Sequence, residues 1–289
     1  MVLVNTKIVI FCCNGLYQRY LIQRIAEEYH LAGVIIREDP QAKGSLWQRI
    51  IRHVNPIELV QYIIARLSLC RNKYQENSLV KRLFYINNKE PSIPENVRLL
   101  KVADINDPAT ITFIKALKPD IVCVNGTNII REPVLNLASS IRYGFINLHT
   151  GLSPYSRGGN CNHFVLLEGH PEWVGITIHH IDAGIDSGDI IISAQVEMEA
   201  QDTYEMIDAK TFHLGIDMML VAIRQLSEGR AARVKLWEQG KLFLKRTGYI
   251  YHPYLHVKVN RMIKKGLLFR YLKNKKQTDR NVKLVGRQN

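Results

Sequence analysis

Asn147 and His149 place an amide and an imidazole two residues apart in an otherwise apolar run, GFINLHT at 144–150. Residues two apart in a β-strand point to the same side, so these side chains are expected to lie together. A second segment, DAGIDSGD at 182–189, supplies three carboxylates and two glycines in a short turn. Such a turn can bring a carboxylate to His149 and expose backbone groups to a ligand. Amide and imidazole N–H groups can stabilise a developing oxyanion, and a carboxylate can orient the imidazole or accept a proton.

Each segment also has a simpler interpretation when it is taken alone. A polar pair at the end of a strand can serve only to close a loop. A turn rich in Asp and Gly is usually a solvated hairpin. The functional reading therefore depends on whether the fold brings the two segments together.

The surrounding pattern predicts an α/β fold with a mostly parallel, Rossmann-like sheet and flanking helices. The apolar run at 8–13 is typical of a strand covered on both faces, and a helical stretch at 16–29 and a second strand at 31–36 follow it. Further strands are predicted at 97–102, 120–125, 144–149, 174–181 and 190–198, and helices at 108–117, 133–139 and 203–226. His149 then ends a strand before a loop rich in Gly, Ser and Asn. Open α/β sheets bind ligands at this end of their strands.

Two parts of the chain fit this scheme poorly. Residues 40–96 are expected to be a helical insertion, with helical periodicity at 47–54 and 56–69. We expect residues 1–228 to form the catalytic domain. Residues 229–289 are expected to form a small β-hairpin, from strands at 234–237 and 241–245, followed by a basic helical region.

The net charge of +13 belongs to the C-terminal end. Residues 241–289 hold fourteen Lys or Arg and one acid, Asp279, whereas residues 1–240 are balanced. The charge therefore gives no reason to expect the catalytic body to bind nucleic acid. Five cysteines without metal-ligand spacing suit small apolar fillers in a reducing compartment. The short apolar run near the N-terminus lacks the features of a secretory leader. Together with the cysteines, this run favours a soluble cytoplasmic protein.

The two polar segments together carry a more specific resemblance. FINLHTGLSPYSRGG (145–159) and GITIHHIDAGIDSGDII (175–191) resemble the signature of the folate-dependent formyltransferases, which act on glycinamide ribonucleotide, methionyl-tRNA or nucleotide sugars. The catalytic Asn-x-His of that family falls on Asn147 and His149, and its catalytic aspartate falls on Asp186. The usual His-Pro-Ser-Leu-Leu-Pro is altered here to HTGLSP. By this resemblance, Asn147 and His149 donate to the formyl oxygen, most strongly if His149 is charged. Asp186 then orients His149, favours its charged form and collects the proton of the amine.

The resemblance also implies N10-formyltetrahydrofolate as the cosubstrate and no metal. Its pterin pocket is expected at 128–130 and along the acidic turn, from the residues Asn128, Ile129, Ile130, Ile181, Asp182, Ala183, Gly184 and Ile185. His179 and His180 are neighbours in a strand and face opposite ways, so a structural role is expected for both. Cys161 is expected to be a spectator.

The wording of the loop most resembles enzymes that formylate nucleotide-linked amino sugars of surface polysaccharides, such as lipopolysaccharide. Substrate contacts are expected from Asn14, Gly15, Arg157, Asn160 and Asn162, although turn-forming roles for the last three stay open. Methionyl-tRNA is the alternative acceptor, but the family members that act on it carry a C-terminal β-barrel, which fits residues 241–289 poorly. A formyltetrahydrofolate hydrolase, with water as acceptor, and a non-catalytic binding module also stay open.

Apolar residues alternate with the basic ones at 259–272, which predicts a helix that packs on the body or on a second subunit. A homodimer is therefore expected, and nucleic acid is not. Peripheral contact of this tail with an anionic membrane is the alternative.

Overall fold

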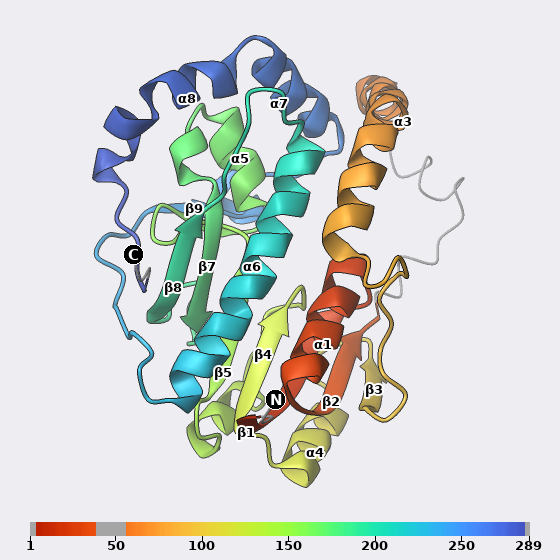
Figure 1. Cartoon of the computed structure of the whole chain (residues 1–289), viewed down its shortest axis with the longest axis vertical. Helices are drawn as coiled ribbons and strands as arrows, with labels where there is room; N and C mark the ends of the chain where they lie inside the picture. The colour runs from red at the N-terminus through yellow and green to blue at the C-terminus, as the bar shows by residue number, and fades with distance from the viewer. Residues whose placement is uncertain (1–3, 39–55, 287–289) are drawn as a thin grey trace.

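The structure, a computed structural model, describes residues 4–38 and 56–286. Its centre is a seven-stranded sheet in the order β3-β2-β1-β4-β5-β7-β8 (Figure 1). The first five strands of that order run parallel, β7 runs antiparallel to β5, and β8 runs antiparallel to β7. This arrangement confirms the predicted mostly parallel sheet with flanking helices. The strand bounds are β1 Val4–Cys13, β2 Tyr29–Arg37, β3 Arg98–Val102, β4 Ile121–Asn125, β5 Phe145–His149, β7 Gly175–His180 and β8 Ile190–Gln195.

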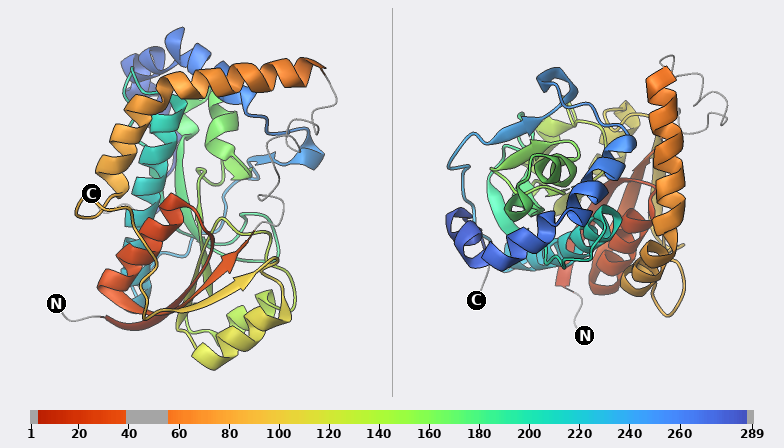
Figure 2. Two further views of the ribbon diagram at one scale, coloured as in Figure 1. Left: turned by 90° about the vertical axis from the view of Figure 1, so that its right-hand side faces the viewer. Right: turned by 90° about the horizontal axis from the view of Figure 1, so that it is seen from above.

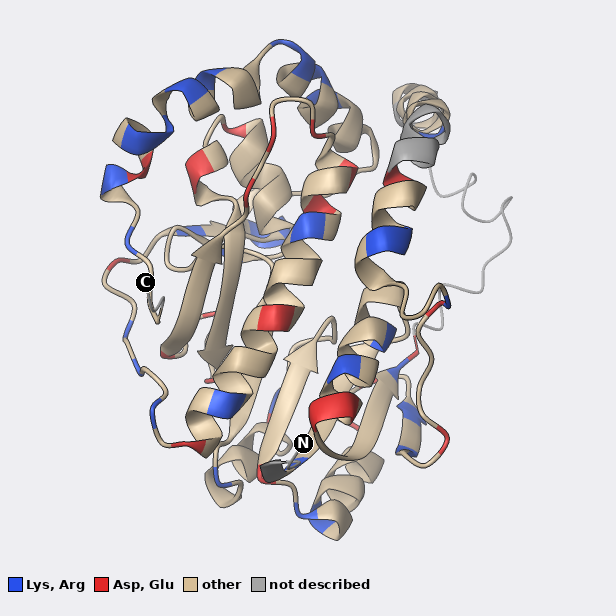
Figure 3. Ribbon diagram, in the orientation of Figure 1, with Lys and Arg blue, Asp and Glu red and all other residues tan. Residues whose placement is uncertain are grey.

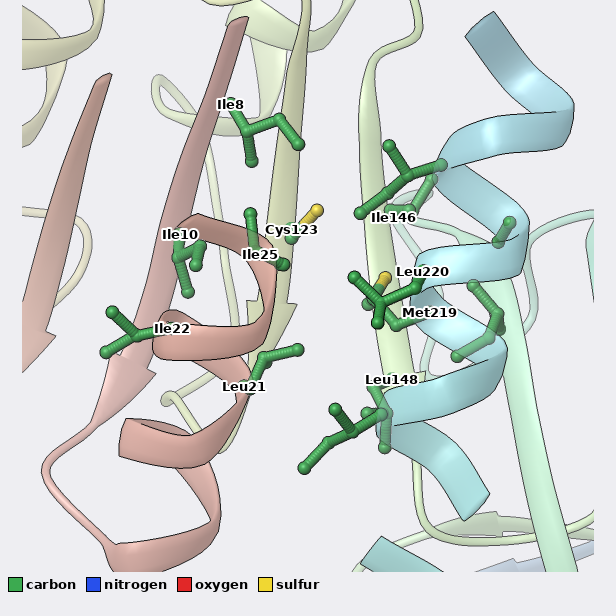
Figure 4. Packing of buried hydrophobic residues seen from close by; sticks show 14 of the residues in the cluster. Ile8, Ile10, Leu21, Ile22, Ile25, Cys123, Ile146, Leu148, Met219 and Leu220 are labelled. Atoms are coloured by element: carbon green, nitrogen blue, oxygen red, sulfur yellow. The ribbon is translucent and has the colours of Figure 1, made fainter. Parts of the chain in front are cut away.

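Helices cover both faces of this sheet, which is why its central strands are apolar without interruption. On one face, Ile8 and Ile10 of β1 lie beside apolar side chains of α1, and Ile146 and Leu148 of β5 lie beside those of α6 (Figure 4). On the other face, Val9 and Phe11 meet side chains of α4 and of the 3-10 helix η2. The helix bounds are α1 Leu16–Glu28, α3 Pro56–Phe84, α4 Pro108–Leu117, η2 Leu135–Ser140, α5 Cys161–Leu167, α6 Tyr204–Ser227, α7 Tyr254–Lys264 and α8 Leu267–Thr278.

The connection between β2 and β3 contains α3, a helix of 29 residues. The stretch 56–69, expected to be helical, forms its first part, whereas the helix expected at 47–54 lies outside the described residues. α3 contacts α1, α6 and α7. Figure 2 shows the first part of α3 reaching along the end of the molecule where α7 and α8 also lie.

The β-hairpin expected between residues 234 and 245 does not form, so that prediction was wrong. Val234 makes an isolated bridge to Ile190 at the edge of the main sheet. The second segment, β9 (Lys241–Phe243), pairs in parallel with β6 (Ser156–Gly158) in a small separate sheet. Both segments pair with the body instead of with each other. Local alternation of apolar residues does not reveal which edge a strand will join.

The basic helices α7 and α8 pack their apolar sides on the body. Asn260 fixes α7, because its Oδ1 accepts a hydrogen bond of 2.8 Å from the Tyr204 N–H at the start of α6. Lys and Arg residues follow both helices along the outside of the molecule (Figure 3), and all of them except the partly buried Lys275 are exposed. The buried residues that join this second core from α7 and α8 are Val259, Ile263, Leu267, Leu268 and Tyr271.

Candidate active site

The three residues that the sequence singled out meet at the carboxyl end of β5. Asn147 Nδ2 donates to Asp186 Oδ1 at 3.3 Å. Nδ1 of His149 lies 3.4 Å from Asp186 Oδ2. Asn147 and His149 come from the strand, and Asp186 comes from the loop between β7 and β8. The acidic turn is thus no detached hairpin, because it delivers one carboxylate to the strand pair.

The loop that carries Asp186 is held by its own side chains. Asp182 Oδ1 accepts from the Gly184 N–H at 3.0 Å and from the Ser187 hydroxyl at 2.8 Å. Asp186 has a φ of +45°, in the left-handed region that Asp and Asn enter more readily than most residues. Its Oδ2 also accepts from the Gly158 N–H at 2.9 Å. The carboxylate is therefore fixed from two loops that are distant in sequence.

The resting site combines an ionised carboxylate with a neutral imidazole. Burial raises the pKa of Asp186. The contacts with His149, His179 and the Gly158 N–H lower that pKa by more than burial raises it, so the net pKa lies well below its ordinary value. Burial lowers the pKa of His149, and Asp186 offsets this only in part. Asp186 thus favours the charged form of His149, as expected, but the larger effect of burial leaves the ring neutral in the resting site. The other ring nitrogen, Nε2, lies 3.2 Å from the Ser156 carbonyl oxygen, so only an imidazolium could donate to both neighbours.

His179 belongs to this cluster, although a structural role was expected for it. It lies directly opposite Asn147 in the antiparallel pair of β5 and β7, so both side chains project from the same face. His179 Nε2 lies 3.3 Å from Asn147 Nδ2 and 3.3 Å from Asp186 Oδ1. Its Nδ1 lies 2.7 Å from the His180 carbonyl oxygen, which accepts a hydrogen bond from the N–H of that nitrogen. His180 points to the other side of the sheet, as predicted, and contributes nothing to the cluster.

The loop after β5 fits closely around His149. A Cβ added at Gly151 would lie 2.3 Å from His149 Nε2 and 2.7 Å from the Cβ of Cys161. The buried Thr177 hydroxyl anchors this loop, since it donates to the Gly151 carbonyl at 2.8 Å and accepts from the Ser153 N–H at 2.9 Å. In the resembled pattern a serine stands where Gly151 stands here. The glycine is the residue that lets the ring occupy its observed position.

A cavity of about 410 Å³ opens beside this cluster, within the size range of small-molecule sites. Ile129 is 54% exposed on its wall, which leaves apolar surface for a ligand. Ala183 alone of the residues expected to hold the pterin does not line the cavity. The expected residues that do line it are Asn128, Ile129, Ile130, Ile181, Asp182, Gly184 and Ile185.

The residues expected to bind the acceptor have different positions. Asn160 lines the cavity, whereas Asn14 and Gly15 do not. Arg157 lies just outside it in β6, and within the described chain its buried Nε has no hydrogen-bond partner. The prediction for Asn162 was wrong: its side chain is buried and exchanges hydrogen bonds of 2.9 and 3.0 Å with the Gly175 backbone. That pairing joins α5 to β7 and leaves the amide no group for a ligand.

Several residues that the sequence did not single out also line the cavity, among them two polar and two apolar side chains. Gln18 Nε2 donates to Asn125 Oδ1 at 2.7 Å, and Asn125 Nδ2 donates to the Leu148 carbonyl at 3.0 Å. The two apolar side chains are those of Phe212 in α6 and of Leu244, just after β9. Only the position of Asn125, at the carboxyl end of a predicted strand, could have pointed to a site.

Cys161 sits next to the cluster but is not equipped as a nucleophile. It is fully buried, and burial raises the pKa of its thiol well above the ordinary value. A reactive cysteine needs the opposite shift. In residues 4–38 and 56–286 no group of His, Cys, Asp and Glu side chains is arranged to hold a metal ion.

Comparison with known proteins gives relatives of several kinds. Over 143 residues the chain is 28% identical to a methionyl-tRNA formyltransferase of Chlorobium luteolum, covering 50% of this chain and 44% of that protein. The chain thus spans less than half the length of this relative. Two solved structures show the same fold. A 4-N formyltransferase from Francisella tularensis has 19% identity and a TM-score of 0.51, covering 82% of this chain and 75% of the other. Glycinamide ribonucleotide transformylase 1 from Symbiobacterium toebii has 20% identity and a TM-score of 0.52, covering 81% and 95%.

A family model described as formyl transferase matches residues 56–223, more than half of the chain. The matched range includes α3 as well as Asn147, His149 and Asp186. With the shared fold, this match decides the classification. The chain belongs to the formyl transferase family.

Proposed function

We propose that this protein transfers a formyl group from N10-formyltetrahydrofolate to the amine of a nucleotide-linked amino sugar. The convergence of Asn147, His149 and Asp186 at the mouth of one cavity carries the proposal. Two N–H donors and one ionised carboxylate are the groups that acyl transfer to an amine requires. A binding module would need the cavity but not this arrangement.

The lining of the cavity suits the chemistry of a folate. Ile129, Ile130, Ile181 and Ile185 offer apolar walls for a flat pterin, and backbone groups of the ordered acidic loop offer polar contacts. The folate, when bound, supplies the activated formyl group. The residues of this chain hold it, exclude water and orient its carbonyl group.

The side chains then act on the charges that change during transfer. Negative charge develops on the formyl oxygen as the amine attacks, and preorganised donors stabilise it. Asn147 Nδ2 has two contacts in the resting site, each of 3.3 Å, and either can be exchanged for a shorter bond to that oxygen. A ring N–H of His149 is the second donor. Asp186 orients the ring and, directly or through water, accepts the proton that the amine loses.

The features beside the cavity favour a phosphorylated acceptor. Arg157 carries a buried Nε without a partner in the described chain, and it lies one residue before Gly158, which lines the cavity. A guanidinium can bind a diphosphate in two-point contact. Asn160, on the cavity wall, can donate to sugar or phosphate oxygens. These residues support a nucleotide sugar as acceptor and surface polysaccharide synthesis as its destination.

Methionyl-tRNA remains the second candidate acceptor, because the Chlorobium relative is a methionyl-tRNA formyltransferase. Against it, the described residues 241–286 form one short strand, two α-helices and two 3-10 helices, whereas the β-barrel of methionyl-tRNA formyltransferases consists of strands. The formyltetrahydrofolate hydrolase alternative uses the same cluster with water as acceptor. Formate release in the absence of any amine would identify it.

The proposal is tested by incubating the protein with formyltetrahydrofolate and a panel of UDP-, dTDP- and GDP-linked amino sugars. Mass spectrometry should show one nucleotide sugar in which CHO replaces an amine hydrogen. Initiator methionyl-tRNA is included as the competing acceptor. Formylation of the tRNA alone would overturn the sugar assignment and leave the formyltransferase assignment in place.

A further inference from the structure

The first part of α3 exposes large apolar side chains in a way that the rest of the described chain does not. Val60 is 55% exposed, Ile63 49%, Ile64 40% and Leu67 67%. With 3.6 residues per turn these four fall within an arc of about 100°, and we call this surface the α3 stripe. Ala65, on the opposite side of the helix, is fully buried. A contiguous apolar surface of this kind usually marks an interaction site.

The surface next to the α3 stripe is strongly basic. Residues 254–281, which hold α7 and α8, contain nine Lys or Arg and one acid, Asp279. Phe269, 62% exposed, lies among these charges on the outer side of α8. α3 contacts α7, and all three helices lie at the same end of the molecule (Figures 2 and 3). The exposed basic residues are Lys258, Arg261, Lys264, Lys265, Arg270, Lys273, Lys276 and Arg280.

We propose that this end of the molecule docks on the surface of an anionic lipid bilayer, with the α3 stripe entering the interface and the basic helices facing lipid headgroups. Apolar side chains beside Lys and Arg are the pattern of helices that lie in a membrane interface. Within residues 4–38 and 56–286 no helix has the length and hydropathy needed to cross a bilayer. The contact is therefore peripheral.

Charge distinguishes this partner from a second copy of the chain. Two copies that met through this end would bring two such basic surfaces together, and like charges repel. The four stripe residues also span only about two helical turns, short of the surface that a stable dimer buries. An anionic bilayer satisfies both the apolar and the basic part of the surface.

The apolar part is tested with the double variant Val60→Gln/Leu67→Gln in a vesicle sedimentation assay. Vesicles contain phosphatidylcholine alone or with added phosphatidylglycerol. Wild type should bind the anionic vesicles at low salt, and the double variant should lose at least about tenfold in affinity. Leu99→Gln, on the distant strand β3 and 44% exposed in the native protein, is the matched control and should bind like wild type.

The basic part is tested with Lys273→Gln/Lys276→Gln, which should weaken binding about 25-fold, since each cation near an anionic surface adds roughly fivefold. All variants should keep the wild-type unfolding temperature and, without vesicles, the wild-type formyl-transfer rate. Failure of wild type to bind anionic vesicles, equal binding to neutral ones, or unchanged binding by either double variant would overturn the proposal. So would a wild-type dimer, seen by light scattering, that Val60→Gln/Leu67→Gln dissociates. None of these outcomes depends on the identity of the acceptor.

Discussion

Asp186 faces the ring of His149 with 3.4 Å between Oδ2 and Nδ1, yet burial keeps the pKa of that imidazole below its ordinary value. The carboxylate favours the charged ring, but burial outweighs this effect, so Asp186 orients a neutral ring in the resting site. The attacking amine must also be neutral. The amine and the imidazole are thus both in their neutral forms on the alkaline side of their pKa values.

This pairing predicts the pH dependence of formyl transfer. The rate should rise with pH as the amine loses its proton. An ordinary imidazole loses its proton around pH 6.5, but His149 is already neutral there, so the rate should not fall as the pH rises past about 6.5. NMR titration of His149 in the resting enzyme should give a pKa below that ordinary value. A measured pKa at or above it, with a matching alkaline loss of rate, would contradict the neutral ring.

His179 separates a positioning role from a purely structural one. His179→Gln keeps a polar side chain but not the ring that contacts Asn147 and Asp186, so kcat should fall by about tenfold or more with little change in KM. His180→Gln is the matched control, because the neighbouring side chain faces the other side of the sheet. Both variants should unfold near the wild-type temperature. Equal kcat values for the two variants would show that His179 does not position Asn147 and Asp186 for the reaction.

Gly151 tests the fit around His149. In Gly151→Ala the new Cβ would fall 2.3 Å from His149 Nε2 and 2.7 Å from the Cβ of Cys161, so the ring or the loop must move. Displacement of about 1 Å can cost on the order of 10²-fold in rate. Cys161→Ala, which keeps its Cβ and removes only the sulfur, should retain activity. Full activity in Gly151→Ala would show that the ring position does not matter.

Burial of His163 should make the folded protein less stable in acid. It is fully buried beside the rings of Tyr204 and His256, and burial together with His256 lowers its pKa to about 3. The unfolded chain takes up a proton below about pH 6.5, whereas the native ring does not, so stability falls as the pH drops toward 3. The slope is up to about 1.4 kcal/mol per pH unit. His163→Phe should reduce this slope in urea unfolding measured at several pH values, and an unchanged slope would exclude His163 as its source.

Much of this site could be predicted because its signals are local. The two-residue spacing of Asn147 and His149 on one strand places both side chains without further information. Asp186 follows from the family pattern and not from spacing, since Asp182 and Asp189 are equally acidic. The residues expected to hold the pterin come from the same family pattern, and of these only Ala183 does not line the cavity.

The parts of the site that the sequence did not predict depend on contacts between distant segments. His179 enters the site through the register of β5 and β7, which pairs it with Asn147 and cannot be read from either strand alone. Phe212 reaches the cavity from α6, and Leu244 reaches it because β9 joins β6 instead of closing a hairpin. Asn162 looked available because loop asparagines often are. It is buried by the packing of α5 against β7.

The central claim is that Asn147, His149 and Asp186 form one formyl-transfer centre. Its most direct test is the single-turnover rate of formyl transfer to the amino sugar in Asn147→Ala and Asp186→Asn, each compared with wild type at matched thermal stability. Asn suits the second variant because it also tolerates the left-handed backbone at 186 and changes mainly the charge. The account predicts a loss of about 10²- to 10³-fold in each variant, the usual effect of removing one preorganised group. A folded variant that transfers formyl at the wild-type rate would contradict it.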